Sequence, residues 1–225
     1  MRRPAPLGIL MLDTRFPRPH GDVGAASSFA FPVRYAVVRG ASPQRVVREA
    51  DPRLLQPFVD AALALCAAGA GAIPTSCGFL ALWQRELQAA LPVPVWTSAL
   101  LKLPELRAPG VLTVEAASLG PRHFEAVGAD PRTPTEGLAA GCSLQRTLLE
   151  DLPALDAAAA EADTVAAARR LVERHPAIDS IVLECTNLPP YADAVERATG
   201  RPVHHIVSLL HERHAALAAA GATRG

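Results

Sequence analysis

Two of the four cysteines, Cys77 and Cys185, stand where a thiol can do chemistry. Each ends a short apolar run and precedes a helical stretch, in Ile73-Pro74-Thr75-Ser76-Cys77-Gly78-Phe79 and Ile181-Val182-Leu183-Glu184-Cys185-Thr186-Asn187. Ligands of open parallel sheets bind at this strand-to-helix edge, where unpaired backbone N–H groups favour a thiolate and a bound carboxylate. The pattern predicts proton-transfer or nucleophilic chemistry on a small anion.

Small polar residues flank both cysteines. Gly78 lets the backbone approach a ligand closely, and Ser76, Thr186 and Asn187 carry hydrogen-bond donors that can hold a carboxylate. The same residue types cap helices, so a capping role stays open beside ligand binding.

The remaining cysteines and the paired histidines do not suggest a metal site. Cys66 and Cys142 lie in apolar helical stretches, where a cysteine is usually a small buried hydrophobe. Neither C-x-x-C nor zinc-finger spacing occurs. His204 and His205 are adjacent, so they point apart on a strand, and titration or substrate contact fits them better. We therefore expect no metal.

Composition excludes several partners. The 225 residues carry 22 Lys and Arg against 22 Asp and Glu, so no excess charge favours nucleic acid or an anionic membrane. The first apolar run stops at Asp13, and no later run approaches the roughly 20 apolar residues that span a bilayer. Neither a dinucleotide fingerprint nor a G-x-S-x-G elbow is present. We expect a soluble cytoplasmic protein without a cofactor.

Apolar runs alternate with Ala- and Leu-rich helical stretches, which is typical of βαβ units around parallel sheets. We predict strands near Gly8–Leu12, Val33–Val38, Gly71–Pro74, Val93–Trp96, Gly110–Glu115, Asp179–Glu184 and Val203–Val207. We predict helices at Asp51–Ala68, Gly78–Ala90, Pro121–Val127, Pro134–Glu150, Thr164–Arg174, Pro190–Thr199 and Leu209–Ala219.

The chain also shows a weak internal duplication. The run from Gly8 to Asp13 resembles the run from Gly110 to Glu115, and each is followed at a similar distance by a strand that ends in a cysteine. A chance match of short apolar runs stays open, but the matched cysteines favour two α/β half-domains. We predict residues 1–108 for the first and 109–207 for the second, with a terminal helix at 208–225 that packs on the first.

These features resemble the aspartate/glutamate/hydantoin racemase superfamily over essentially the whole chain. The most specific match is Glu184-Cys185-Thr186-Asn187-Leu188-Pro189-Pro190-Tyr191, and Thr75-Ser76-Cys77-Gly78 is similar to the first-cysteine motif. The resemblance implies two Rossmann-like half-domains with parallel sheets, related by a pseudo-two-fold axis, and an active site in the cleft between them.

The resemblance also implies a cofactor-independent racemase or epimerase. One of Cys77 and Cys185 would remove the proton α to a carboxylate and the other would return one to the opposite face. Substrate binding would fall to residues beside the cysteines and in the loops after each opening strand: Asp13, Thr14, Ser76, Gly78, Ser118, Thr186 and Asn187.

Departures from the family pattern leave the substrate open. Gly78-Phe79 replaces an Asn-Thr pair and Asn187 replaces the histidine of glutamate racemases. An arylmalonate-type decarboxylase, a maleate-type isomerase and a two-lobed binding protein are alternatives, although such decarboxylases keep one cysteine. Whether the chain forms homo-oligomers also stays open. The basic loop 15–22 is either a lid or a Pro-rich surface loop, and we favour the surface loop.

Overall fold

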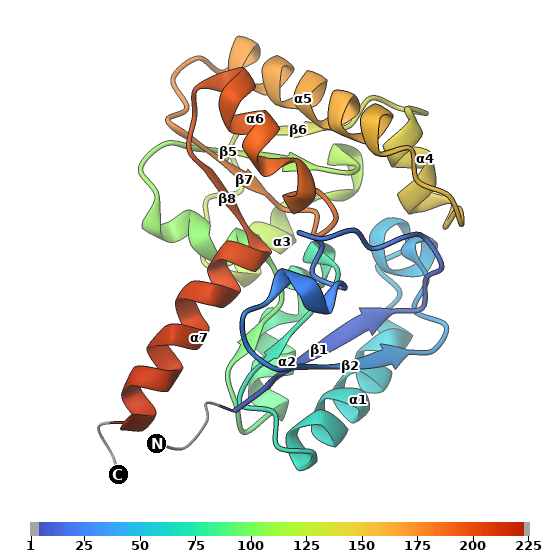
Figure 1. Cartoon of the computed structure of the whole chain (residues 1–225), viewed down its shortest axis with the longest axis vertical. Coiled ribbons are helices and arrows are strands. Elements are labelled where there is room, and N and C mark those ends of the chain that lie inside the picture. The colour runs from blue at the N-terminus through green and yellow to red at the C-terminus, as the bar shows by residue number, and fades with distance from the viewer. Residues whose placement is uncertain (1–4, 223–225) are drawn as a thin grey trace.

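The computed structural model describes residues 5–222, which form two α/β halves with parallel strands (Figure 1). In the first half, β1 (Leu7–Leu12) pairs with β2 (Val33–Val38), and single bridges join β1 to the chain around β3 (Ile73–Pro74), which pairs with β4 (Val95–Trp96). In the second half the order is β6 (Thr135–Gly137), β5 (Pro109–Thr113), β7 (Ser180–Leu183) and β8 (Val203–His205).

Both halves therefore have the same spatial strand order: the strand that comes second in the chain lies at one edge, followed by the first, the third and the fourth. This equivalence confirms the predicted α/β class with two similar parallel-sheet halves. It also puts β3 and β7, the strands before the two cysteines, at corresponding positions.

α1 (Leu55–Ala67) shows how a helix covers its sheet with an apolar stripe. Its buried residues are Phe58, Ala62 and Leu65, which recur at helical spacing. The other helices are α2 (Gln84–Ala90), α3 (Pro121–Ala126), α4 (Ser143–Leu149), α5 (Ala157–Arg174), α6 (Ala192–Thr199) and α7 (Ile206–Ala222). α1 packs on the first sheet, while α5 packs on the second sheet and on α6 (Figure 1).

The stretches directly after the cysteines are tighter than α-helices. A 3₁₀ segment, Gly78–Trp83, precedes α2, and another, Pro189–Tyr191, precedes α6. The predicted helices at Gly78–Ala90 and Pro190–Thr199 are thus present, but each begins with 3₁₀ turns.

The predicted helix Pro134–Glu150 is wrong over its first part. Thr135–Gly137 forms β6, which pairs in parallel with β5, and the helix begins only at Ser143. Gly141 has φ +74°, which does not continue a helix, and Cys142 caps α4 instead of lying inside it. The edge strand gives the second sheet the counterpart of β2.

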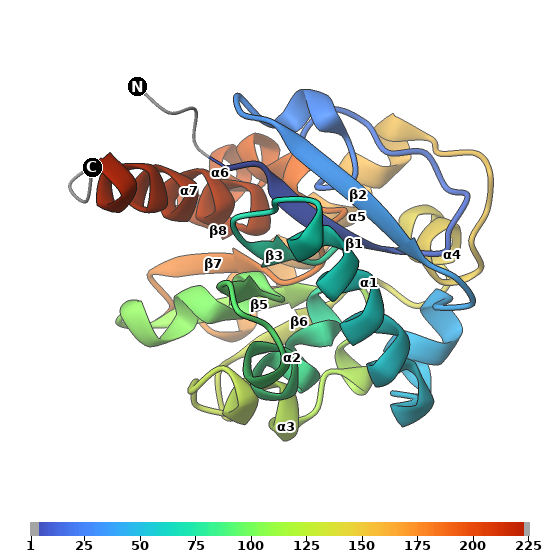
Figure 2. The same cartoon turned by 90° about the horizontal axis from the view of Figure 1, so that it is seen from below.

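α7 leaves the second sheet and runs beside the first half, where the middle of the helix contacts Ala5 (Figure 2). His214 is buried, hydrogen-bonds through Nε2 to the carbonyl of Ala5 at 3.2 Å, and stacks on Phe31 at 3.8 Å. His211 hydrogen-bonds to the carbonyl of Ser28. Both histidines therefore face the first half of the chain. Within residues 5–222, no helix has the length and apolar character needed to cross a bilayer.

Candidate active site

Cys77 and Cys185 line one small cavity between the two halves. Both thiols are buried, at 8% and 6% relative exposure, and each follows the end of its strand. The cavity has a volume of about 30 Å³, which leaves room for little more than a water molecule. Its apolar walls are Leu12, Phe16, Pro43, Val47, Phe79, Val114, Leu148 and Leu149. A substrate therefore needs these walls to move apart before it can bind.

Hydrogen bonds hold the two cysteine turns against each other. The hydroxyl of Thr186 donates to the carbonyl oxygen of Ser76 at 2.5 Å. Ser76 Oγ accepts from the backbone N–H of Leu12 at 2.9 Å, which fixes this turn to the end of β1. Ser76, Gly78, Thr186 and Asn187, all predicted to bind substrate, thus line the same cavity as the cysteines.

A buried polar chain connects the second cysteine to the loop after β1. Cys185 Sγ lies 3.7 Å from Asn187 Oδ1, and Asn187 Nδ2 donates to Asp22 at 2.6 Å. Arg18 forms an ion pair with Asp22 and lies 4.4 Å over the ring of Phe16. This segment covers the cavity, because Phe16 and Asp22 are almost fully buried. Residues 15–22 thus form a surface loop only in part, since Arg15, Pro17 and His20 are exposed whereas Phe16 and Asp22 are buried.

The other predicted binding residues lie elsewhere. Asp13 is exposed and accepts a hydrogen bond from the backbone N–H of Gly40. Thr14 accepts from Arg18, and Ser118 donates to Glu115. None of Asp13, Thr14 and Ser118 lines the cysteine cavity in this closed arrangement.

The environment of Cys77 opposes ionisation. Burial raises the pKa of this thiol to about 12, and the carboxylate of Glu184 acts in the same direction. The backbone N–H groups of Phe79 and Leu80 and the charge of Arg18 lower the pKa, but by less.

The environment of Cys185 opposes ionisation as well. Burial raises its pKa well above the ordinary value, followed by the charges of Glu184, Cys77 and Asp22. The N–H of Asn187 opposes this. We expected turns that favour a thiolate, and the structure corrects that expectation for the closed state: burial outweighs the N–H groups. A thiolate formed here is scarce, but it is a stronger base than an exposed one.

Glu184 also belongs to the site, although the sequence pattern marks it only as the first residue of the second cysteine motif. Its side chain is fully buried, and Oε2 accepts from the hydroxyl of Thr113 at 2.6 Å. Burial raises the pKa of Glu184 to about 7, although the Thr113 hydrogen bond acts against this. A charged residue at the end of an otherwise apolar strand was the available signal. Phe16 was also missed, since only the fold of the loop brings it over the cavity.

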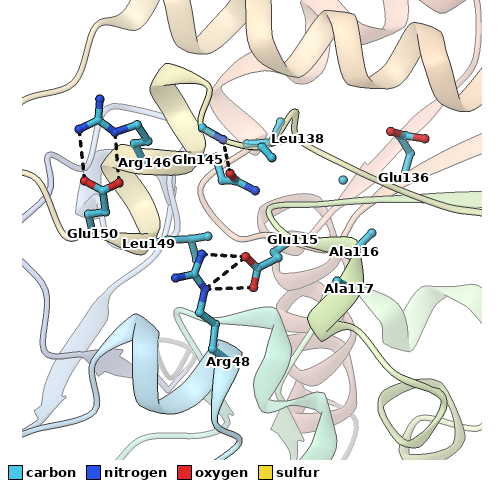
Figure 3. Close-up of a pocket in the computed structure, with 13 residues that line it drawn as sticks. Arg48, Glu115, Ala116, Ala117, Glu136, Leu138, Gln145, Arg146, Leu149 and Glu150 are labelled. Carbon is cyan, nitrogen blue, oxygen red and sulfur yellow. Dashed lines mark hydrogen bonds and ion pairs between the residues drawn. The ribbon is translucent and has the colours of Figure 1, made fainter.

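A larger cavity of about 590 Å³ lies beside the small one, at the ends of β5 and β6 (Figure 3). Leu149 lines both cavities. Val47 and Val114 line the small cavity, while their chain neighbours Arg48 and Glu115 line the large one. Arg48 pairs with Glu115 at 2.9 Å and so bridges the two halves (Figure 3). The two cavities are therefore neighbours that share the side chain of Leu149.

No group of three or more His, Cys, Asp or Glu within residues 5–222 is arranged to hold a metal ion. His204 and His205 are both half-buried, and Nδ1 of His205 accepts from the backbone N–H of Ser208 at the start of α7.

Comparison with known proteins finds sequence relatives of known family. No protein-family model matches the chain. A dimethylsulfoniopropionate lyase of Durusdinium sp. clade D is 30% identical over 227 residues, covering 90% of this chain and 72% of the relative. Dimethylsulfoniopropionate lyase 3 of Emiliania huxleyi is 30% identical over 235 residues, covering 94% of this chain and 59% of that protein. The chain thus spans about three fifths of the Emiliania relative.

Solved structures share the fold at lower identity. A glycine-to-cysteine variant of arylmalonate decarboxylase with sulfate has a TM-score of 0.63 and 19% identity, covering 96% of this chain and 94% of that one. Allantoin racemase from Pseudomonas fluorescens has a TM-score of 0.59 and 15% identity, with 96% and 92% covered. An aspartate racemase homologue from Pyrococcus horikoshii has a TM-score of 0.57 and 15% identity, with 94% and 99% covered.

Proposed function

Because the chain belongs to the family of the dimethylsulfoniopropionate lyases, within the aspartate/glutamate/hydantoin racemase superfamily, we propose that it removes the proton α to a carboxylate with a cysteine thiolate, without a cofactor. One observation carries the proposal: Cys77 and Cys185 line the same cavity from equivalent turns of two like sheets. A substrate carbon between them can exchange a proton with either sulfur.

The first step is common to lyases and racemases. A thiolate takes the α-proton, so an S–H bond forms, and the electron pair of the C–H bond passes into an enediolate. If the β-carbon carries a sulfonium group, the C–S bond then breaks. Its electron pair stays on sulfur, and the new double bond gives acrylate and dimethyl sulfide. Without a leaving group, a proton returned to the opposite face inverts the α-carbon. The substrate therefore decides the outcome.

The walls of the cavity suit a small carboxylate with a cationic, methylated end. The apolar side chains around the cavity can pack on the methyl groups of a sulfonium, which would share the Phe16 ring with the Arg18 guanidinium that lies 4.4 Å over it. At the other side, Ser76 Oγ accepts from Leu12 and can still donate its own proton to a carboxylate oxygen. Lyase activity on dimethylsulfoniopropionate or a close analogue is the function that we propose first.

Racemisation or epimerisation is the second candidate. It is supported by the second thiol, because elimination needs one base whereas inversion needs an acid on the opposite face. Both sulfurs are buried against the same cavity, which supports a two-face exchange.

The test is a substrate panel in deuterated water, read by NMR and by headspace detection of dimethyl sulfide. It includes dimethylsulfoniopropionate, amino acids, hydantoins and substituted malonates. We expect acrylate and dimethyl sulfide from the first compound. Deuterium at an inverted α-carbon of another compound would favour the second candidate. Binding without turnover or exchange of any compound would contradict both and favour a binding protein.

A further inference from the structure

Glu184 is a buried carboxyl that touches the turns of both cysteines. It directly precedes Cys185, and its side chain reaches the turn after Cys77: a Cβ added at Gly78 would lie 2.3 Å from Oε1. Oε2 accepts from Thr113, but among the described residues Oε1 has no hydrogen-bond partner, although it is buried. A buried carboxyl oxygen without a partner is costly, so its retention in this position calls for an explanation.

Three acidic groups share this water-poor region: Glu184, Cys77 and Cys185. Each negative charge opposes the next, since the charge of Glu184 disfavours ionisation of both thiols. Two further charged residues reach the region from the loop after β1. Arg18 favours ionisation of Cys77, and Asp22 disfavours that of Cys185. The region thus tolerates one negative charge far better than two.

We propose that Glu184 is a positioning residue that controls thiolate formation, with its free Oε1 carrying a proton whenever Cys77 or Cys185 is a thiolate. The exchange balances without an added reagent: an S–H bond breaks, an O–H bond forms on the carboxylate, and one negative charge moves from oxygen to sulfur. The proposal takes from the proposed function only that these two thiols ionise. The partnerless oxygen is explained, because it is the atom that receives the proton.

The acidity of Glu184 fits this role. Burial raises the pKa of its carboxyl to about 7, so both the neutral and the charged form are populated near neutral pH. Because the Thr113 hydroxyl lowers that pKa, Thr113 sets the balance between the two forms. An ordinary exposed glutamate would be almost fully ionised at neutral pH and could not hold the proton.

The test is the pH profile of iodoacetamide alkylation of the resting protein, with each cysteine measured separately by peptide mass mapping. The midpoint of a profile reports the ionisation of that thiol averaged over the closed and open forms of the cavity, and the plateau rate at high pH shows whether a variant also changes the opening. In Glu184→Gln we expect the midpoints of Cys77 and Cys185 to fall, with about tenfold faster alkylation below the midpoint for each pH unit of the fall. Cys66 and Cys142 are internal references, and exposed Glu86→Gln is the matched control.

Thr113→Val keeps the test valid if Glu184→Gln does not fold. Removing the hydroxyl should raise the pKa of Glu184, so both thiols should react faster near neutral pH and converge with wild type at high pH. Unchanged midpoints in a folded Glu184→Gln variant would overturn the proposal. Since alkylation needs no substrate, inactivity toward every compound in the panel would count against the proposed function and leave this result standing.

Discussion

The Thr186 hydroxyl donates to the carbonyl of Ser76 at 2.5 Å, which ties the residue after one cysteine to the residue before the other. The bond is buried and joins residues 110 positions apart in the sequence. The separation between the two thiols is therefore set by backbone and short side chains, not by long flexible ones. Such a site can hold its reacting groups in place without help from a ligand.

Gly78 should tolerate no side chain. A Cβ there would lie 2.2 Å from the carbonyl oxygen of Glu184, which is backbone and cannot turn aside. We expect Gly78→Ala to lower the free energy of unfolding by about 2 kcal/mol or more. Gly120→Ala is the control, because nothing lies within 4 Å of its Cβ position, and it should cost less than about 1 kcal/mol. Urea unfolding of both variants checks this, and equal losses would contradict the close approach.

Asp22 should hold the covering loop closed. Its carboxylate accepts from Asn187 and from the backbone N–H of Gly24, both at 2.6 Å, and pairs with Arg18. Asp22→Asn leaves these buried donors poorly matched, so we expect a loss of about 1–3 kcal/mol of stability and faster alkylation of Cys185. The exposed Asp60→Asn change should do neither. Protection of Cys185 at the wild-type level in Asp22→Asn would show that the loop is not its cover.

Phe16 should discriminate in favour of a cationic substrate. Phe16→Leu keeps an apolar wall but removes the ring face. We expect KM for dimethylsulfoniopropionate to rise by about 2- to 30-fold, in line with a cation–π contact of about 0.5–2 kcal/mol. Phe29→Leu, outside the cavity, is the control. A KM that rises equally in both variants would argue against the ring as a sulfonium contact.

His205 should make stability depend on pH. Its Nδ1 accepts from Ser208 N, and its own N–H donates to Ser208 Oγ, so the two residues cap α7 reciprocally. Burial lowers the pKa of His205 to about 4. As the pH falls, the unfolded chain therefore protonates His205 before the folded chain does. The contribution of His205 to stability is complete above pH 6.5 and is lost as the pH falls toward 4, with a loss of about 2 kcal/mol at pH 5.

The variant that checks this is His205→Asn, which keeps a capping oxygen but does not titrate. We expect its unfolding free energy to change less between pH 7.5 and pH 5 than that of wild type. Some dependence should persist, because burial also lowers the pKa of His204. Parallel pH dependence in the two proteins would rule out His205 as the source.

Much of the fold follows from local sequence. The strand predicted at Val33–Val38 is β2 and has those bounds. The apolar runs before Cys77 and Cys185 form β3 and β7, as predicted. Local pattern suffices for β3 and β7 because their residues are all buried, whereas in β2 only Val38 is buried and the β-branched and aromatic residues Val33, Tyr35 and Val37 provide the signal. β6 was missed because Thr135–Gly137 is short and largely polar, and it is a strand only through pairing with β5.

The residues of the candidate site were predictable in part, since Asp13, Thr14 and Ser118 do not line the cavity, and its electrostatics were not. The two motifs identify the thiols and their small polar neighbours. Local sequence does not show that the loop with Phe16 and Asp22 closes over them, nor that burial outweighs the backbone N–H groups at Cys77. Both depend on contacts between the two halves, which no single segment encodes.

Proton exchange at the α-carbon in deuterated water, followed by NMR for wild type, Cys77→Ala, Cys185→Ala and the double variant, tests the central claim most directly. We expect the double variant to lose exchange and elimination by at least about a hundredfold, and each single variant to lose inversion. The single variant that also loses elimination identifies the base. Exchange at the wild-type rate in a folded double variant would show that neither sulfur moves the proton.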